Sequence, residues 1–173
     1  MKKPVQTGFF FTNISGDLTP KIMTITIPIR PANLRYLRVK YSFHDVYVLS
    51  RQQALGHLLQ ELLRPKPRFY APIDTSTLPV LSVQLVKTGQ YAHLVHLEDH
   101  AVAAFNQFVD EIMRAEFIAH VHALTEYAGL DVNESIYHFI EKYGFQDEEL
   151  SFEALKRYHS RFRRKSELLS LSA

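Results

Sequence analysis

Basic residues concentrate near the C-terminal end of the chain. Six of the ten positions 156–165 are Lys or Arg, and the rings of Tyr158, His159 and Phe162 lie between them. Helix-borne cations neutralise phosphates and release counterions, and aromatic rings add stacking faces or an anchor. The pattern predicts a nucleic-acid contact, with DNA favoured, made by Lys156, Arg157, Arg161, Arg163, Arg164 and Lys165.

Two other interpretations of this cluster stay open, because charge is strongly segregated along the chain. Residues 1–97 hold 12 basic and 4 acidic residues, residues 98–150 hold 2 and 12, and residues 151–173 hold 6 and 2, for a net charge of +2. The basic end could pack against the chain's own acidic segment, where cations near a helix C-terminus also favour the helix dipole. A third interpretation is that it meets an acidic surface of another protein.

A second, smaller basic cluster lies near residue 35. It mixes cations with aromatic residues, as a surface that tracks phosphates requires: Arg30, Arg35, Tyr36, Arg38, Lys40 and Tyr41. We take Arg35 and Arg38 as possible additional nucleic-acid contacts. The alternative is the ordinary polar face of a short helix.

Metal binding and catalysis have little support in the sequence. His93, His96 and His100 are spaced as ligands on a helix would be, but a strand would send His93 and His96 to opposite faces. Glu116 and His120 are four residues apart, and pairs of charged residues at this spacing usually lie on the solvated surface of a helix. The chain contains no GxxxxGK[ST], GxGxxG, GxSxG or HExxH motif. We expect a non-catalytic protein with no cofactor and no bound metal.

Composition sets the class of protein. The chain has 173 residues, of which 46% are apolar, and no Cys, which excludes disulfides, thiolate zinc sites, iron–sulfur clusters and Cys nucleophiles. The apolar patch at residues 8–11 is too short for a secretion signal. The longest uncharged stretch that could suggest a membrane segment, residues 75–86, contains Pro79 and is too short to span a bilayer. We expect a cytoplasmic protein without a membrane partner.

Strands and short helices are predicted for the first part of the chain. Residues 1–20 are turn-rich and are interpreted as an arm. Period-two alternation and helical spacing predict a strand over 21–30, a helix from Pro31 to about Tyr41, and a strand over 45–49. A helix over 51–63, capped by Ser50, is expected next, followed by a long connection to 77. Residues 79–86 and 91–97 are expected to form a hairpin through residues 87–90.

Residues 98–173 read as helical throughout. Apolar residues recur at three and four from Asp99, a candidate N-cap, to about Ala128, and Gly129 ends this helix. Asp131 and Glu134 form a capping-box pair that starts a helix over 132–143. A basic helix capped by Ser151 follows. The fold class is therefore α+β, with a small basic part of about four strands and a helical part with one long helix and two shorter ones.

The last two helices invite comparison with a helix-turn-helix. In that motif the connection has three or four residues and the second helix enters the major groove. Here the connection, residues 144–150, is longer and contains Asp147, Glu148 and Glu149. The spacing therefore gives the comparison low specificity.

Residues 136–164 carry a family resemblance. The segment 136–145 reads IYHFIEKYGF, and residues 148–158 read EELSFEALKRY before the Arg-rich end at 161–164. This sequence resembles the C-terminal ends of small uncharacterised proteins of bacterial phages and integrative mobile elements. The resemblance covers about 30 residues and implies a mobile-element context, with no functional residue to carry over.

Taken together, these features predict a non-catalytic protein that contacts the phosphate backbone of nucleic acid. The alternative is an assembly or adaptor protein that forms a homo-oligomer by pairing the acidic helix 98–128 of one chain with the basic N-terminal part or tail of another.

Overall fold

A computed structural model describes residues 21–50, 52–65, 77–87 and 94–170. Most of the predicted long connection and the whole of the predicted arm lie outside these ranges. The described chain runs β1 (Lys21–Pro28), α1 (Pro31–Tyr41), β2 (Val46–Val48), α2 (Ala54–Leu62), β3 (Arg64–Pro65), β4 (Val80–Lys87), β5 (Leu94–His96), α3 (Asp99–Tyr127), α4 (Val132–Tyr143) and α5 (Phe152–Ser170). This is the α+β organisation that the sequence predicts, with strands and two short helices before residue 98 and helices alone in the described residues after it.

The main sheet has three strands in the order β1–β4–β2. β4 is central, antiparallel to β1 and parallel to β2. Alternate residues of β1 and β4 are buried, including Ile25, Ile27, Leu81 and Val83, as the period-two pattern requires. One hydrophobic core includes these side chains and those of the long helix α3, such as Phe105.

Three sequence predictions are wrong in detail. The predicted hairpin does not form, because β4 belongs to the main sheet whereas β5 pairs with β3 in a second sheet. The second helix begins at Ala54, three residues later than predicted, and its N-cap is Gln53. Ser50 instead accepts a hydrogen bond from the backbone N–H of Gln52, 3.3 Å away. α3 has Glu98 at the N-cap position, where Asp99 was expected.

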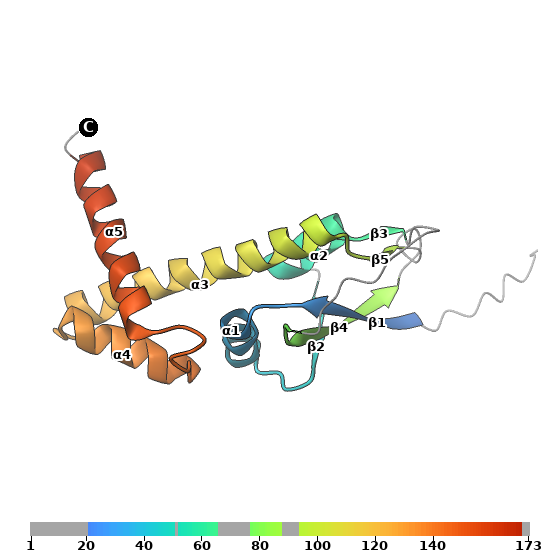
Figure 1. Cartoon of the computed structure of the whole chain (residues 1–173), viewed down its shortest axis with the longest axis horizontal. Helices are drawn as coiled ribbons and strands as arrows, with labels where there is room; N and C mark the ends of the chain where they lie inside the picture. The colour runs from blue at the N-terminus through green and yellow to red at the C-terminus, as the bar shows by residue number, and fades with distance from the viewer. Residues whose placement is uncertain (1–20, 51, 66–76, 88–93, 171–173) are drawn as a thin grey trace, which may run out of the picture.

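The helical part places α3 along the length of the molecule (Figure 1), with α2 and the sheet toward one end, α4 and α5 at the other, and α1 between the sheet and α4. The predicted capping box of α4 is present: the Asp131 carboxylate accepts from the backbone N–H of Glu134, whose side chain accepts from the N–H of Asp131. α4 ends at Gly144, whose φ of 65° is the left-handed conformation that glycine adopts without strain. None of the helices in the described ranges has the length and apolar character needed to cross a bilayer.

A buried amide attaches α1 to α3. The Asn106 side chain accepts from the backbone N–H of Arg30 at 2.8 Å and donates to the carbonyl of Pro28 at 3.0 Å. Asn33 donates to the backbone carbonyl of Asn106 at 2.9 Å. Asn106 therefore satisfies backbone groups between β1 and α1 that burial would otherwise leave unpaired.

Glu116 joins α1, α3 and α4. Its carboxylate accepts hydrogen bonds from the hydroxyls of Tyr36 and Tyr143 and from the ammonium groups of Lys40 and Lys142. Burial alone would raise the pKa of this carboxyl, but the donors outweigh burial and lower it to about 2. We use the name α1 junction for the contacts centred on Asn106 and Glu116, together with the ion pair of Arg35 and Glu149.

Candidate functional site

The base of the C-terminal helix α5 is held against the rest of the molecule. Ser151 accepts a hydrogen bond from the backbone N–H of Ala154 at 3.3 Å, which confirms the predicted cap. Leu155 is 3% exposed, and the ring of Tyr158 lies 6.3 Å from that of Phe117 on α3. The guanidinium of Arg114 lies 4.7 Å from the centre of the Tyr158 ring. The first two turns of α5 are therefore fixed in place.

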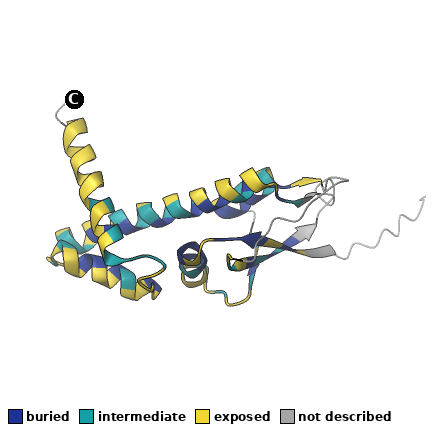
Figure 2. Ribbon diagram, viewed as in Figure 1, coloured by how far each residue is buried: buried dark blue, intermediate teal, exposed yellow. Residues whose placement is uncertain are grey.

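Beyond His159, α5 projects away from α3 and α4. Figure 1 shows this end of the helix standing clear of the other elements, and every residue from 160 to 170 is exposed (Figure 2). The predicted basic cluster thus lies on a helix that is packed at its base and surrounded by solvent along the rest of its length.

The six cations are distributed unevenly around α5. Arg157, Arg161 and Arg164 recur at spacings of four and three, so that they form one ridge along the helix. The same periodicity puts this ridge on the face away from Leu155 and Phe162. The remaining three cations, Lys156, Arg163 and Lys165, flank it. We call Arg157, Arg161 and Arg164 the arginine ridge.

Few acidic groups meet these cations. Arg163 pairs with Glu167 on the same helix at 3.1 Å. Arg157 donates through Nε to the backbone carbonyl of Glu153. Among the described residues, Arg161, Arg164 and Lys165 form no ion pair, and no acidic residue of the segment 98–150 pairs with α5. The described acidic segment therefore forms no direct ion pair with the basic helix.

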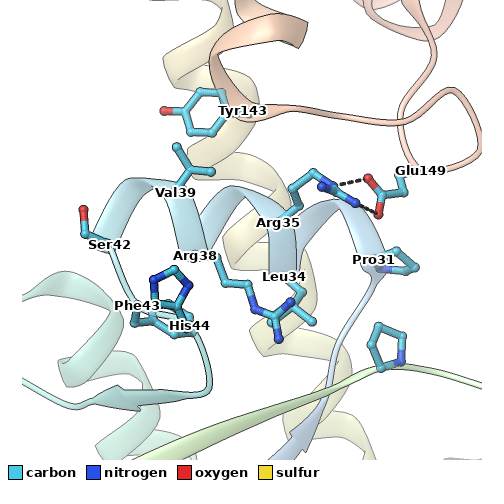
Figure 3. A pocket seen from close by; sticks show the side chains of 11 residues that line it. Pro31, Leu34, Arg35, Arg38, Val39, Ser42, Phe43, His44, Tyr143 and Glu149 are labelled. Carbon is cyan, nitrogen blue, oxygen red and sulfur yellow. Dashed lines mark hydrogen bonds and ion pairs between the residues drawn. The ribbon is translucent and has the colours of Figure 1, made fainter.

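Acidic residues of that segment are instead paired with other cations. Glu116 meets Lys40 and Lys142. Glu149, in the connection before α5, forms a two-bond contact with Arg35 on α1 that includes a 2.9 Å bond from Nη2 (Figure 3). The hydrogen bond with Glu149 raises the pKa of the Arg35 guanidinium above its ordinary value. Arg35, which the sequence suggested as a nucleic-acid contact, thus holds the α4–α5 connection against α1.

Arg38, unlike Arg35, forms no ion pair among the described residues. It is exposed and lines an open hollow of about 670 Å³, which Arg35, Ser42 and His44 also line (Figure 3). No residue of α5 lines this hollow. The structure therefore does not bring the two predicted basic clusters into one site: α5 carries six cations, and α1 contributes Arg38 separately.

Two further features were not predicted from the sequence. The imidazole rings of His120 on α3 and His138 on α4 approach each other, with 3.2 Å between Nε2 and Nδ1. Burial, and to a smaller extent the charge of Lys142, lowers the pKa of His120 below its ordinary value.

An apolar groove of about 850 Å³ also lies between α3 and α5. Its one visible signal was the spacing of Ala115, Ala119 and Ala123. In the described ranges, no three side chains of His, Asp or Glu are grouped so that they could hold a metal ion.

Comparisons of the chain with protein-family models, with curated proteins and with solved structures find no match.

Proposed function

We propose that the protein binds nucleic acid without catalysis, by contacting the phosphate backbone through α5. The observation that carries the proposal is that the cations of α5 lie on an exposed, projecting helix while the described acidic residues of segment 98–150 pair elsewhere or not at all. Charges without intramolecular partners pay no cost of breaking a contact when they meet phosphate.

The arginine ridge is the centre of the proposed contact. Three guanidiniums on one face of a regular helix suit the phosphates that border a groove of duplex DNA, because the major groove admits an α-helix. Arginine also forms two parallel hydrogen bonds to phosphate, which lysine does not. Duplex DNA is therefore the favoured partner, with Lys156, Arg163 and Lys165 adding charge at the sides.

The proposed interface differs from the sequence prediction at α1. Arg35 no longer belongs to the proposed interface, because Glu149 already occupies its guanidinium. Arg38 remains a second, separate candidate. Sequence-specific base reading is not part of the proposal, and a mobile-element setting stays a prediction from the resemblance at residues 136–164.

Fluorescence anisotropy tests the proposal. Labelled duplex DNA, single-stranded DNA and RNA of random sequence are titrated with the protein at about 50 mM and about 200 mM salt, a range over which several phosphate contacts weaken affinity by orders of magnitude. The expected result is binding in the micromolar range at the lower salt, strongest for duplex DNA. Absence of binding to all three would overturn the proposal.

A pair of matched variants locates the contact. Arg161→Gln with Arg164→Gln removes two charges from the ridge, whereas Arg30→Gln with Arg64→Gln removes two exposed charges elsewhere. We expect the first pair to weaken binding about tenfold or more and the second pair to weaken it only slightly. Equal losses for the two pairs would mean that net charge, and not α5, determines the binding.

A further inference from the structure

The hollow beside α1 has the size and the mixed lining of a small-molecule site. Its volume of about 670 Å³ lies within the range of about 300–1,000 Å³ that is common for ligand pockets. The polar part of its lining comes from α1, the turn after α1, the end of α4 and the α4–α5 connection. The apolar part consists of Pro31, Leu34, Val39, Phe43 and Pro79. This lining suits a molecule with an apolar body and a polar group.

Contacts within the protein hold the walls of this hollow in place. Ser42 ends α1 in the left-handed conformation, and the backbone N–H groups of Ser42 and Phe43 donate to carbonyls of the last helical turn. The Phe43 ring lies 5.3 Å from that of Tyr47 in β2. Toward the other end of α1, Glu149 fixes the guanidinium of Arg35. A hollow that is formed in advance loses little conformational freedom when a ligand binds.

The charges of the lining favour an anion. The side chains of Arg38 and His44 form no ion pair among the described residues. The carboxylate of the lining, that of Glu149, already accepts two hydrogen bonds from Arg35. The charge of Arg38 is therefore not compensated within the hollow. Apolar walls of low dielectric focus the field of such a charge, so that it attracts an anion more strongly than on an open surface.

The available donors suit a phosphate group. The guanidinium of Arg38 can donate two parallel hydrogen bonds to neighbouring phosphate oxygens, and the imidazole of His44 can donate one more. Figure 3 shows the Arg35–Glu149 pair near the Pro31 end of α1, whereas His44 lies in the turn after the other end. A phosphate at Arg38 and His44 is thus placed away from the Glu149 carboxylate.

We infer that this hollow binds a small phosphate monoester, with the phosphate at Arg38 and His44 and an apolar body against Val39 and Phe43. No residue of α5 lines the site. The inference does not rest on nucleic-acid binding by α5, and it gives Arg38 a ligand of its own.

Isothermal titration calorimetry with phenyl phosphate tests the site. In a phosphate-free buffer at about 50 mM salt, one saturable site per chain is expected. Phenol has the apolar body without the anion, and inorganic phosphate has the anion without the body. Each is expected to bind about tenfold more weakly or less, because each makes only part of the contact. Absence of binding by phenyl phosphate, or equal binding of either control compound, would overturn the inference.

Two pairs of variants locate the site. Arg38→Gln is expected to weaken phenyl phosphate binding about tenfold or more, whereas Arg64→Gln, at an exposed arginine outside the hollow, is expected to change it little. Val39→Glu adds a carboxylate to the hollow and is expected to abolish binding, whereas Val48→Glu, at an exposed valine on β2, is expected to retain it. Unchanged affinity in Arg38→Gln or in Val39→Glu would contradict the inference, once circular dichroism shows that the variants are folded.

Duplex DNA separates this site from the contact proposed for α5. The affinity of Arg38→Gln for labelled duplex DNA, measured by anisotropy, is expected to stay within about twofold of the wild type. Equal losses of duplex DNA and of phenyl phosphate would return Arg38 to the nucleic-acid contact and overturn the inference. A chain that binds phenyl phosphate but no nucleic acid would overturn the proposed function and support the site in the hollow.

Discussion

The α1 junction and the projecting end of α5 use charged side chains in opposite ways. At the junction, Glu116 receives four hydrogen bonds from α1 and α4, and Glu149 receives Arg35. On α5, Arg161 and Arg164 form no ion pair among the described residues, although the chain is rich in carboxylates. An abundance of carboxylates along the chain therefore does not decide which cations are paired: ion pairs hold the helices of the junction together, whereas the arginines of α5 are exposed to solvent.

The largest loss of stability is expected at the buried amide of the junction. Asn106→Ala leaves the carbonyl of Pro28 and the N–H of Arg30 buried without their partner and also opens a small void. We expect the free energy of unfolding to fall by about 3 kcal/mol. Urea denaturation followed by circular dichroism measures this change. Gln107→Ala, at the adjacent exposed position, is the control and is expected to cost less than about 0.5 kcal/mol. Equal effects of the two variants would show that Asn106 is not an anchor.

A smaller but pH-dependent loss is expected at Glu116. Glu116→Gln removes the charge that Lys40 and Lys142 contact, and we expect a loss of about 2 kcal/mol at pH 7. Glu111→Gln, at an exposed position on the same helix, is the control and is expected to change little.

The pH dependence follows from the lowered pKa of Glu116. Because the carboxyl titrates at about 2 in the folded chain and near 4.5 when unfolded, its contribution is complete above pH 4.5 and is lost as the pH falls toward 2. The difference in unfolding free energy between wild type and Glu116→Gln should therefore shrink over this interval. A difference that stays constant from pH 7 to pH 2 would contradict the role of the charge.

The smallest effect on stability is expected on α5. Arg161→Gln with Arg164→Gln removes exposed cations that contact no other helix or strand. We expect the free energy of unfolding to change by less than about 0.5 kcal/mol and the thermal midpoint to stay within experimental error of the wild type. A clear destabilisation would show that these arginines serve the fold, and the contrast between the two regions would fail.

Local signals in the sequence predicted much of the fold. The capping box at Asp131, the glycine at 144 and the long amphipathic spacing after residue 98 specify α3 and α4, because each acts within a few residues of its own helix. Strand pairing was not predictable in the same way. β4 lies near β5 in sequence, yet its partners are β1 and β2, which long-range packing selects.

The candidate site was only partly predictable for the same reason. The clustering of six cations and the cap at Ser151 mark α5 as a basic helix, but they leave open whether the acidic segment covers it. That question depends on contacts such as Arg35 with Glu149 and Tyr36 with Glu116, which join residues 114 and 80 positions apart. The spacing of apolar residues indicates which face of its own helix a residue lies on, and it contains no information on partners so distant in the sequence.

The salt dependence of duplex DNA binding tests the central claim most directly. Anisotropy titrations from about 50 to about 200 mM salt give the slope of log affinity against log salt, which decreases in magnitude by about one for each phosphate contact removed. Neutralising the whole arginine ridge, by Arg157→Gln, Arg161→Gln and Arg164→Gln together, is expected to reduce the slope by about three and to weaken binding strongly. A slope identical to that of the wild type would show that the ridge does not contact phosphate and would contradict the account.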